Sequence, residues 1–377
     1  MKIHQFITLV ALLLGAAVIP ASAEDGVTDT TILIGQTIGV TGVVAAPTKE
    51  MNEGAKAYID SVNRQGGVHG RKIEMRILDD GFVPAKTAVN AEKLIKQERV
   101  FALFQTRGTP HTEAVAPLLA ASGVPLVAPS SGAAIFHTPV NRLIFNVRAK
   151  YQDEVIKGIE HFTTLGFKDI GVLHVDDSFG RDGLEGFKRG MAERKLEPVI
   201  IASFAREKPD VAAAAAQLIK ANPKALIIVS SAKNTVDVIK AIRAQGGTMQ
   251  IMTLSNNSSD SFVKDLGPAG VGLIVSQVTP AADLVSTLLG QEFKVAAKAN
   301  GATVSYAAMD GFVSAKVLVE GLRRAGRNLT RESFIRGLES IHRLDLGGLL
   351  IDYGANDHTG SEFVELTMIG RNGRFVR

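Results

Sequence analysis

Serine and threonine side chains gather in short loops that directly follow apolar stretches, and their hydroxyls are the first candidates for chemistry. Residues 105–110 read Gln-Thr-Arg-Gly-Thr-Pro, and residues 129–133 read Pro-Ser-Ser-Gly-Ala. A serine nucleophile on a strand-to-helix turn requires the pattern Gly-x-Ser-x-Gly and a histidine partner. This chain has Ala-Pro-Ser-Ser-Gly instead, with no histidine beside it. The pattern therefore favours binding over hydrolysis.

Three other patterns could support a cofactor or a metal ion, and each has a simpler explanation. The eight histidines are scattered, and no two lie at a metal-binding spacing on one helix. The glycines of residues 35–42 match neither the dinucleotide fingerprint nor the phosphate loop. The pairs Asp79-Asp80 and Asp176-Asp177 end predicted strands, where they could hold a metal but more simply cap a helix or bond a ligand. We expect no cofactor and no metal site.

The composition excludes several classes of function. The formal net charge is +4 over 377 residues, and no basic run interleaved with aromatic residues points to nucleic acid. The sequence contains no cysteine, so disulfides, thiol chemistry and lipid attachment at a cysteine are all excluded. Since one hydrophobic core rarely organises more than about 250–300 residues, we expect two domains.

The first residues have the composition of a secretory signal peptide. Lys2 supplies a positive charge, residues 6–19 are largely apolar, and Ala21-Ser22-Ala23 is a small-residue cleavage site. A membrane-spanning helix needs about 20 apolar residues, more than this stretch offers before Pro20. The sequence therefore predicts export with cleavage after Ala23.

Strands alternate with helices along most of the chain, and these elements must position the polar loops. The expected strands cover residues 31–38, 72–80, 101–105, 125–128, 143–147, 169–175, 199–203, 225–231 and 250–254. The expected helices cover residues 49–65, 84–98, 110–122, 151–165, 180–194, 210–221 and 233–245. Continuously apolar strands followed by amphipathic helices indicate parallel sheets covered on both faces, so we expect two doubly wound α/β lobes. Ligands bind beyond the carboxyl ends of such strands, which is where the polar loops lie.

Several segments carry a resemblance to a known family. They include NEGAKAYIDSVNRQGGVHGRKIEMRILDD (52–80), GVPLVAPSSGA (123–133) and GVLHVDDSFGRDGLEGFKRGM (171–191). In these segments the chain resembles the periplasmic solute-binding proteins of branched-chain amino acid ABC transporters, and the similarity covers nearly all residues after Ala23. The resemblance implies the type I periplasmic binding protein fold, a clamshell of two α/β lobes joined by three hinge crossings near Val147, Gln277 and Gly347. Lobe 1 would combine residues 24–147 with 279–346, and lobe 2 residues 148–278 with 347–377.

The same resemblance implies a ligand site between the lobes and no catalysis. Backbone N–H groups and hydroxyls of the first lobe would form an uncharged cradle for a carboxylate, helped by the N-terminus of the helix near Pro110. The cradle residues are Thr106, Gly108, Thr109, Ser130, Ser131 and Gly132. The expected contacts from the second lobe are Tyr151, Asp177, Phe179, Asn256 and Asn257.

Two departures from the family pattern bear on the solute. Phe179 stands where the family usually has a tyrosine. Residues 255–259 read Ser-Asn-Asn-Ser-Ser and lack the acidic residue that would hold a ligand ammonium. A buried ammonium without a countercharge costs several kcal/mol. Either Asp177 or Asp153 therefore substitutes, or the ligand has no ammonium.

The solute expected from the resemblance is an aliphatic or branched-chain amino acid. An aromatic acid, another small carboxylate or an amide remains an alternative. The partner implied is an inner-membrane ABC permease, served by a monomeric binding protein. A secreted ligand-sensing subunit is the competing function.

Overall fold

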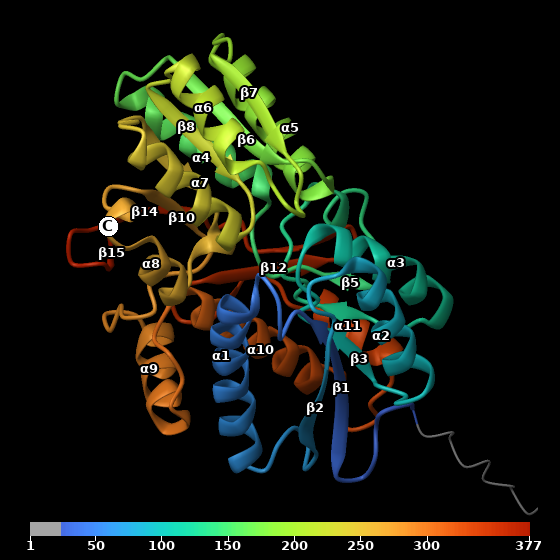
Figure 1. The fold of residues 1–377 in the computed structure, drawn as a ribbon. Coiled ribbons are helices and arrows are strands. Elements are labelled where there is room, and N and C mark those ends of the chain that lie inside the picture. Colours follow the sequence, from blue (N-terminus) through green and yellow to red (C-terminus); the bar gives the residue numbers. More distant parts are fainter. Residues whose placement is uncertain (1–23) are drawn as a thin grey trace, which may run out of the picture.

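The computed structural model describes residues 24–377, and the expected signal peptide lies outside the described residues. Two α/β units lie one above the other, and the strand β12 (Leu350–Gly354) crosses the middle of the molecule between them (Figure 1). Within the described residues, no helix combines the length and the apolar character needed to cross a bilayer.

The first unit is built on a sheet of five parallel strands in the order β2-β1-β3-β4-β5. These strands are β1 Thr31–Ile38, β2 Lys72–Asp79, β3 Ala102–Phe104, β4 Leu126–Val127 and β5 Ile144–Phe145. One face of the sheet packs against α1 (Ala45–Arg64), α9 (Leu288–Asn300), α10 (Tyr306–Ala325) and α11 (Arg331–Glu339). The other face packs against α2 (Pro84–Lys96) and α3 (Thr109–Ser122).

The second unit is built on a sheet in the order β15-β14-β10-β9-β8-β6-β7. The parallel strands are β6 Ile170–Val175, β7 Ile200–Phe204, β8 Ala225–Val229, β9 Gln250–Thr253 and β10 Ile274–Gln277. The antiparallel strands are β14 Glu365–Ile369 and β15 Phe375–Val376. The helices are α4 Tyr151–Thr164, α5 Ser178–Glu193, α6 Val211–Ala221, α7 Ala232–Ala244 and α8 Asp260–Leu266.

The chain passes between the two sheets three times. It leaves β5 for α4, returns from β10 to α9, and leaves β13 (Asp357–Gly360) for β14. The small sheet of β11 (Leu344–Asp345), β12 and β13 packs with the first unit, since Leu349, Ile351 and Tyr353 belong to its core. This packing favours a third crossing after Gly360 over one at Gly347. The lobe boundaries given above remain a prediction.

The alternation of strands and helices predicted from the sequence is confirmed, with ends displaced by a few residues. The largest shift along the first sheet is at α1, which begins at Ala45 although the apolar period predicted a start at residue 49. Pro47 lies in the first turn of this helix, where its missing N–H leaves no hydrogen bond unmade. Because of this proline, the apolar pattern placed the first residue of α1 too late in the chain.

Helices α1 and α10 approach each other closely because glycine stands at both contact points. A Cβ atom on Gly54 would lie 1.8 Å from the carbonyl oxygen of Ala308, and one on Gly311 would lie 1.9 Å from that of Met51. No side chain larger than hydrogen fits at either position without backbone movement. This contact, called the α1–α10 seam below, fixes the position of α1 beside the carboxyl ends of the first sheet.

Candidate functional site

A cavity lies between the two units, where the carboxyl ends of both parallel sheets face each other. The space between its side chains, including the part open to solvent, measures about 370 Å³. The lining residues are Val44, Phe82, Arg107, Gly108, Thr109, Ser130, Tyr151, Phe179, Arg206, Ser231, Ala232 and Asn256.

Six of the eleven candidate residues from the sequence line this cavity, and five do not. The lining six are Gly108, Thr109, Ser130, Tyr151, Phe179 and Asn256. The other five, Thr106, Ser131, Gly132, Asp177 and Asn257, do not line it. Ser131 supports the lining from behind, because its hydroxyl lies 2.8 Å from that of Thr109 and both residues are buried. Gly132 accepts a hydrogen bond from the backbone N–H of Tyr151 at the start of α4.

The two hydroxyl loops are brought together by strand pairing, and this uses part of their backbone. Strands β3 and β4 are neighbours, so the loops that follow them run side by side. The N–H of Gly108 donates to the carbonyl of Ser130, and the N–H of Ser130 donates to that of Thr106. These two N–H groups therefore hold the loops to each other. Gly108 is the N-cap of α3 and Thr109 its first residue, so the positive end of that helix faces the cavity.

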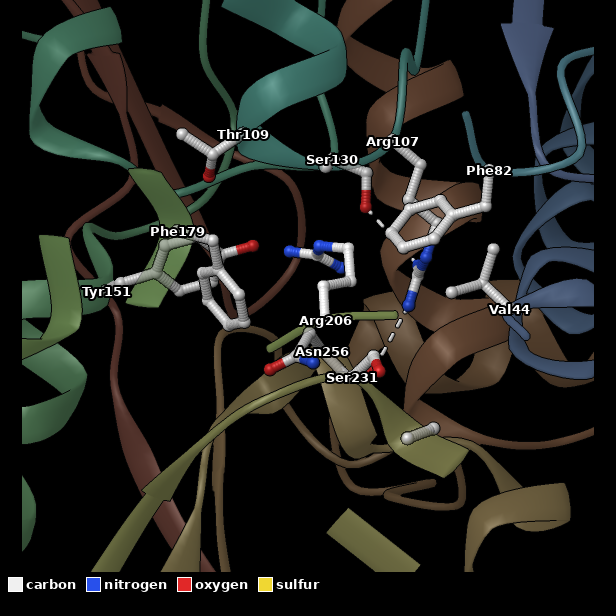
Figure 2. A pocket seen from close by; sticks show the side chains of 12 residues that line it. Val44, Phe82, Arg107, Thr109, Ser130, Tyr151, Phe179, Arg206, Ser231 and Asn256 are labelled. Atoms are coloured by element: carbon white, nitrogen blue, oxygen red, sulfur yellow. Dashed lines mark hydrogen bonds between the residues drawn. The ribbon is translucent and has the colours of Figure 1, made fainter. Parts of the chain in front are cut away.

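Arg107 is the main lining residue that the sequence analysis missed, and it makes the first-lobe side of the cavity charged rather than neutral. Its guanidinium donates from Nη1 to Ser130 Oγ at 3.4 Å and from Nη2 to the carbonyl of Asn256 at 3.0 Å. Dashed lines mark these bonds in Figure 2. Asn256 follows β9 of the second sheet, so Arg107 bridges the two units. Only 8% of Arg107 is exposed.

The charge on Arg107 is not balanced by direct contact with an acid. No carboxylate of the described residues lies within 4.0 Å of its guanidinium, in contrast to the buried Arg148, which pairs with Glu154 at 2.5 Å. Burial lowers the pKa of Arg107, because a guanidinium removed from water loses hydration. A buried cation without an acidic partner is costly, and an anion bound in the cavity would offset that cost.

A second guanidinium enters from the other side of the cavity. Arg206 lies in the loop after β7, and Figure 2 shows it between the Thr109–Ser130 side and the Asn256–Ser231 side. It forms an ion pair with Asp177, and its Cζ lies 5.2 Å from the ring centroid of Phe82. Asp177 also accepts hydrogen bonds from Phe179 N and Gly180 N as the N-cap of α5. Asp177 is therefore already paired and is not part of the lining.

Aromatic rings form the apolar walls. Phe82 has a φ of 60°, a strained conformation for a bulky residue, and is held there by a hydrogen bond from its N–H to Asp80. Its ring stacks on that of His111 with centroids 4.2 Å apart. Tyr151 and Phe179 pack against each other with centroids 4.7 Å apart. Burial raises the pKa of Tyr151, so its hydroxyl stays protonated and can donate a hydrogen bond.

The other polar candidates have structural partners. Asp153 forms an ion pair with Arg189 at 3.3 Å, with both side chains partly exposed, and it does not line the cavity. The amide of Asn257 donates to Thr253 Oγ1 at 2.8 Å. The amide of Asn256 donates to the carbonyl of Ser230 at 2.9 Å, while its Oδ1 atom is buried without a protein partner. Asn256 therefore retains a free acceptor beside the cavity.

The paired aspartates organise the loops near the cavity. Asp79 accepts hydrogen bonds from the N–H groups of Val40, Thr41 and Gly81. Asp80 accepts from Phe82 N and from the hydroxyl of Thr87. Within residues 24–377, no three histidine or acidic side chains come together as a metal site.

The burial of His111 should make the free energy of unfolding depend on pH. The residue is fully buried, and burial lowers its pKa to about 4. An unfolded histidine titrates near 6.5, so below that pH the unfolded state binds more protons and stability falls until the folded-state pKa is passed. At pH 5 the loss from this residue is on the order of 2 kcal/mol. We expect His111→Phe to lose less stability than the natural chain between pH 7 and pH 5 in urea titrations. Equal losses of stability in His111→Phe and in the natural chain would contradict this expectation. His342→Gln, at an exposed site, is the matched control.

Comparisons with known proteins agree with the fold. A family model described as periplasmic binding protein matches residues 31–374. The Leu/Ile/Val-binding protein homolog 3 of Brucella melitensis biotype 1 is 23% identical over 310 residues, which span 78% of this chain and 79% of that protein. A substrate-binding periplasmic protein from Ralstonia solanacearum is 30% identical, with a TM-score of 0.86 over 92% of this chain and 99% of that one. A possible leucine/isoleucine/valine-binding protein from Rhodopirellula baltica has a TM-score of 0.88 at 24% identity over 95% and 98% of the two chains.

Proposed function

Because the chain belongs to the periplasmic binding protein family, we propose that it is an exported carrier for a small carboxylate-bearing solute. The solute binds in the cavity between the two units, and the closed complex delivers it to a membrane permease of the ABC type. The protein binds its solute without transforming it.

The observation that carries this proposal is the position of Arg107. Its guanidinium is buried, contacts loops of both units, and has no carboxylate within contact distance among the described residues. Ser130, the start of α3 and the protonated hydroxyl of Tyr151 add neutral donors around it. A bound carboxylate would receive charge-assisted hydrogen bonds from this group, which are about twice as strong as neutral ones.

Solute binding is coupled to closure through contacts that exist only when the two units meet. The carboxylate of Glu50 on α1 accepts hydrogen bonds from the N–H groups of Asp260 and Ser261 at the start of α8, each at 2.9 Å. Ser178 on α5 donates to Glu113 on α3. A solute that touches both units shifts the balance toward this closed arrangement.

Glu50 tests the coupling without touching the cavity. Glu50→Ala removes two hydrogen bonds of the closed form, so the open form gains population and the apparent affinity falls by roughly ten-fold. Isothermal titration with the solute found in the screen below measures the change. Lys49→Ala, an exposed neighbour on the same helix, should leave the affinity unchanged. An unaltered affinity in Glu50→Ala would show that these bonds do not contribute to closure.

The function itself is tested by recovering and then replacing the natural cargo. Purified protein is unfolded, the released small molecules are identified by mass spectrometry, and the refolded protein is screened against carboxylates by thermal shift. A ligand at one hundred times its dissociation constant stabilises the fold by about 2.7 kcal/mol. We expect a carboxylate that returns chemically unchanged after incubation and denaturation. Conversion of the compound into a product would contradict a carrier.

A further inference from the structure

We infer that the solute is a monocarboxylate with an apolar body and no ammonium group. This inference rests on the proposed function and narrows it against the amino acids that the resemblance favours. Its basis is the distribution of charge around the cavity, in which two guanidinium groups and no carboxylate belong to the lining.

The lining of the cavity contains no anionic partner for an ammonium group. Three lining residues of the second unit are uncharged. Asn256 comes from the loop after β9, and Ser231 and Ala232 lie at the start of α7. An ammonium near Arg107 would be repelled by a like charge in surroundings from which water is largely excluded. The amide oxygen of Asn256 could accept one hydrogen bond, but it is a neutral acceptor.

Each nearby carboxylate is either paired or outside the lining. Asp177 is paired with Arg206 and caps α5. Glu154 is paired with Arg148 and accepts further hydrogen bonds from Ser255 N and Ser276 Oγ. Asp310 on α10 does not line the cavity, and burial raises its pKa, which disfavours its charged form. An amino acid would therefore gain one ion pair at Arg107 and leave its ammonium unpaired.

The remaining surface favours an apolar and flat body. Phe82 forms one wall, and Tyr151 and Phe179 form another. Val44 and Ala232 complete the apolar lining. Together with Arg107, these residues fit a carboxylate at one end of the solute and a ring or a branched hydrocarbon at the other.

Two pairs of compounds that differ only in the ammonium test the inference. They are leucine against 4-methylpentanoate and phenylalanine against 3-phenylpropanoate, with 2-phenylethylamine as the carboxylate-free control. After removal of bound cargo by unfolding and refolding, we expect each acid to bind at least about one hundred-fold more tightly than its amino acid. An amino acid that binds as tightly as its matched acid overturns the inference and leaves the proposed function intact. Binding of the amine but of neither acid overturns the proposed function as well. Binding of none of the five compounds overturns the inference alone, because the carboxylate screen still tests the proposed function.

A pair of variants at Ser231 provides an independent measurement. Ser231 is the N-cap of α7 and lines the cavity, and aspartate and asparagine are both favourable at such a position. Ser231→Asp adds a carboxylate to the lining, so the preference for 3-phenylpropanoate over phenylalanine should shrink at least ten-fold. Ser231→Asn has the same shape without the charge and should keep the preference. A preference that survives in the aspartate variant, with the melting temperature retained, overturns the inference.

Discussion

Arg107→Met is expected to abolish the thermal shift that a carboxylate produces. The guanidinium is the only lining cation of the described residues without an acidic partner within 4.0 Å, since Arg206 is paired with Asp177. Loss of one partner from a buried, hydrogen-bonded ion pair costs about 2–5 kcal/mol, or roughly thirty-fold to several thousand-fold in affinity. Titration calorimetry with the acid that gives the largest shift measures this loss.

The same substitution should have the opposite effect on the protein without solute. Methionine fills a similar volume and removes a charge whose burial is costly, so the melting temperature should stay level or rise. Arg243→Met is the matched control, because Arg243 donates to the carbonyls of Gly247 and Met249 far from the cavity. That variant should lose stability and keep its ligand response. A full ligand response in Arg107→Met would remove the basis of the proposed function.

Glu154→Ala is expected to destabilise the fold by about 3–5 kcal/mol. Glu154 is fully buried and accepts from Arg148 at 2.5 Å, from Ser255 N at 2.9 Å and from Ser276 Oγ at 2.5 Å. Its removal leaves the Arg148 guanidinium, which is only 4% exposed in its side chain, without an acidic partner within contact distance. Urea unfolding of the mature chain measures the change.

Two further variants show whether the loss of stability comes from the unpaired charge of Arg148. Arg148→Met combined with Glu154→Leu removes both charges, and such double replacements of buried pairs are often close to neutral. Glu185→Ala breaks an exposed pair with Lys188, whose side chains are 51% and 62% exposed, and should cost at most about 1 kcal/mol. If Glu154→Ala were no more costly than Glu185→Ala, the buried pair would not stabilise the crossing between the units.

The sequence predicted the fold well because hydrophobic periodicity is a local property. Each parallel strand from β1 to β9 was found, and so were the helices between them. The hydroxyl loops after β3 and β4 were also placed correctly, since the carboxyl ends of neighbouring parallel strands meet at one edge. These inferences needed only the residues within each segment.

The charged part of the cavity was not predicted, because it depends on contacts between distant segments. Arg107 lies within the very loop that was singled out, but nothing local shows that its side chain is buried instead of reaching solvent. Arg206 follows an edge strand, and only the tertiary structure shows that its loop returns to Phe82. Phe82 reaches the cavity through a left-handed backbone conformation that no local preference suggests for phenylalanine.

The α1–α10 seam limits where this protein can be redesigned as a sensor for other acids. Met51, whose carbonyl packs against Gly311, also contacts Arg107 through its sulfur at 3.8 Å. Substitutions along the seam would therefore move the guanidinium of Arg107 and weaken the binding of every solute to a similar degree. Phe179 and Ser231 end at the cavity from the opposite unit, so libraries at those two positions can alter selectivity while the anchor stays in place.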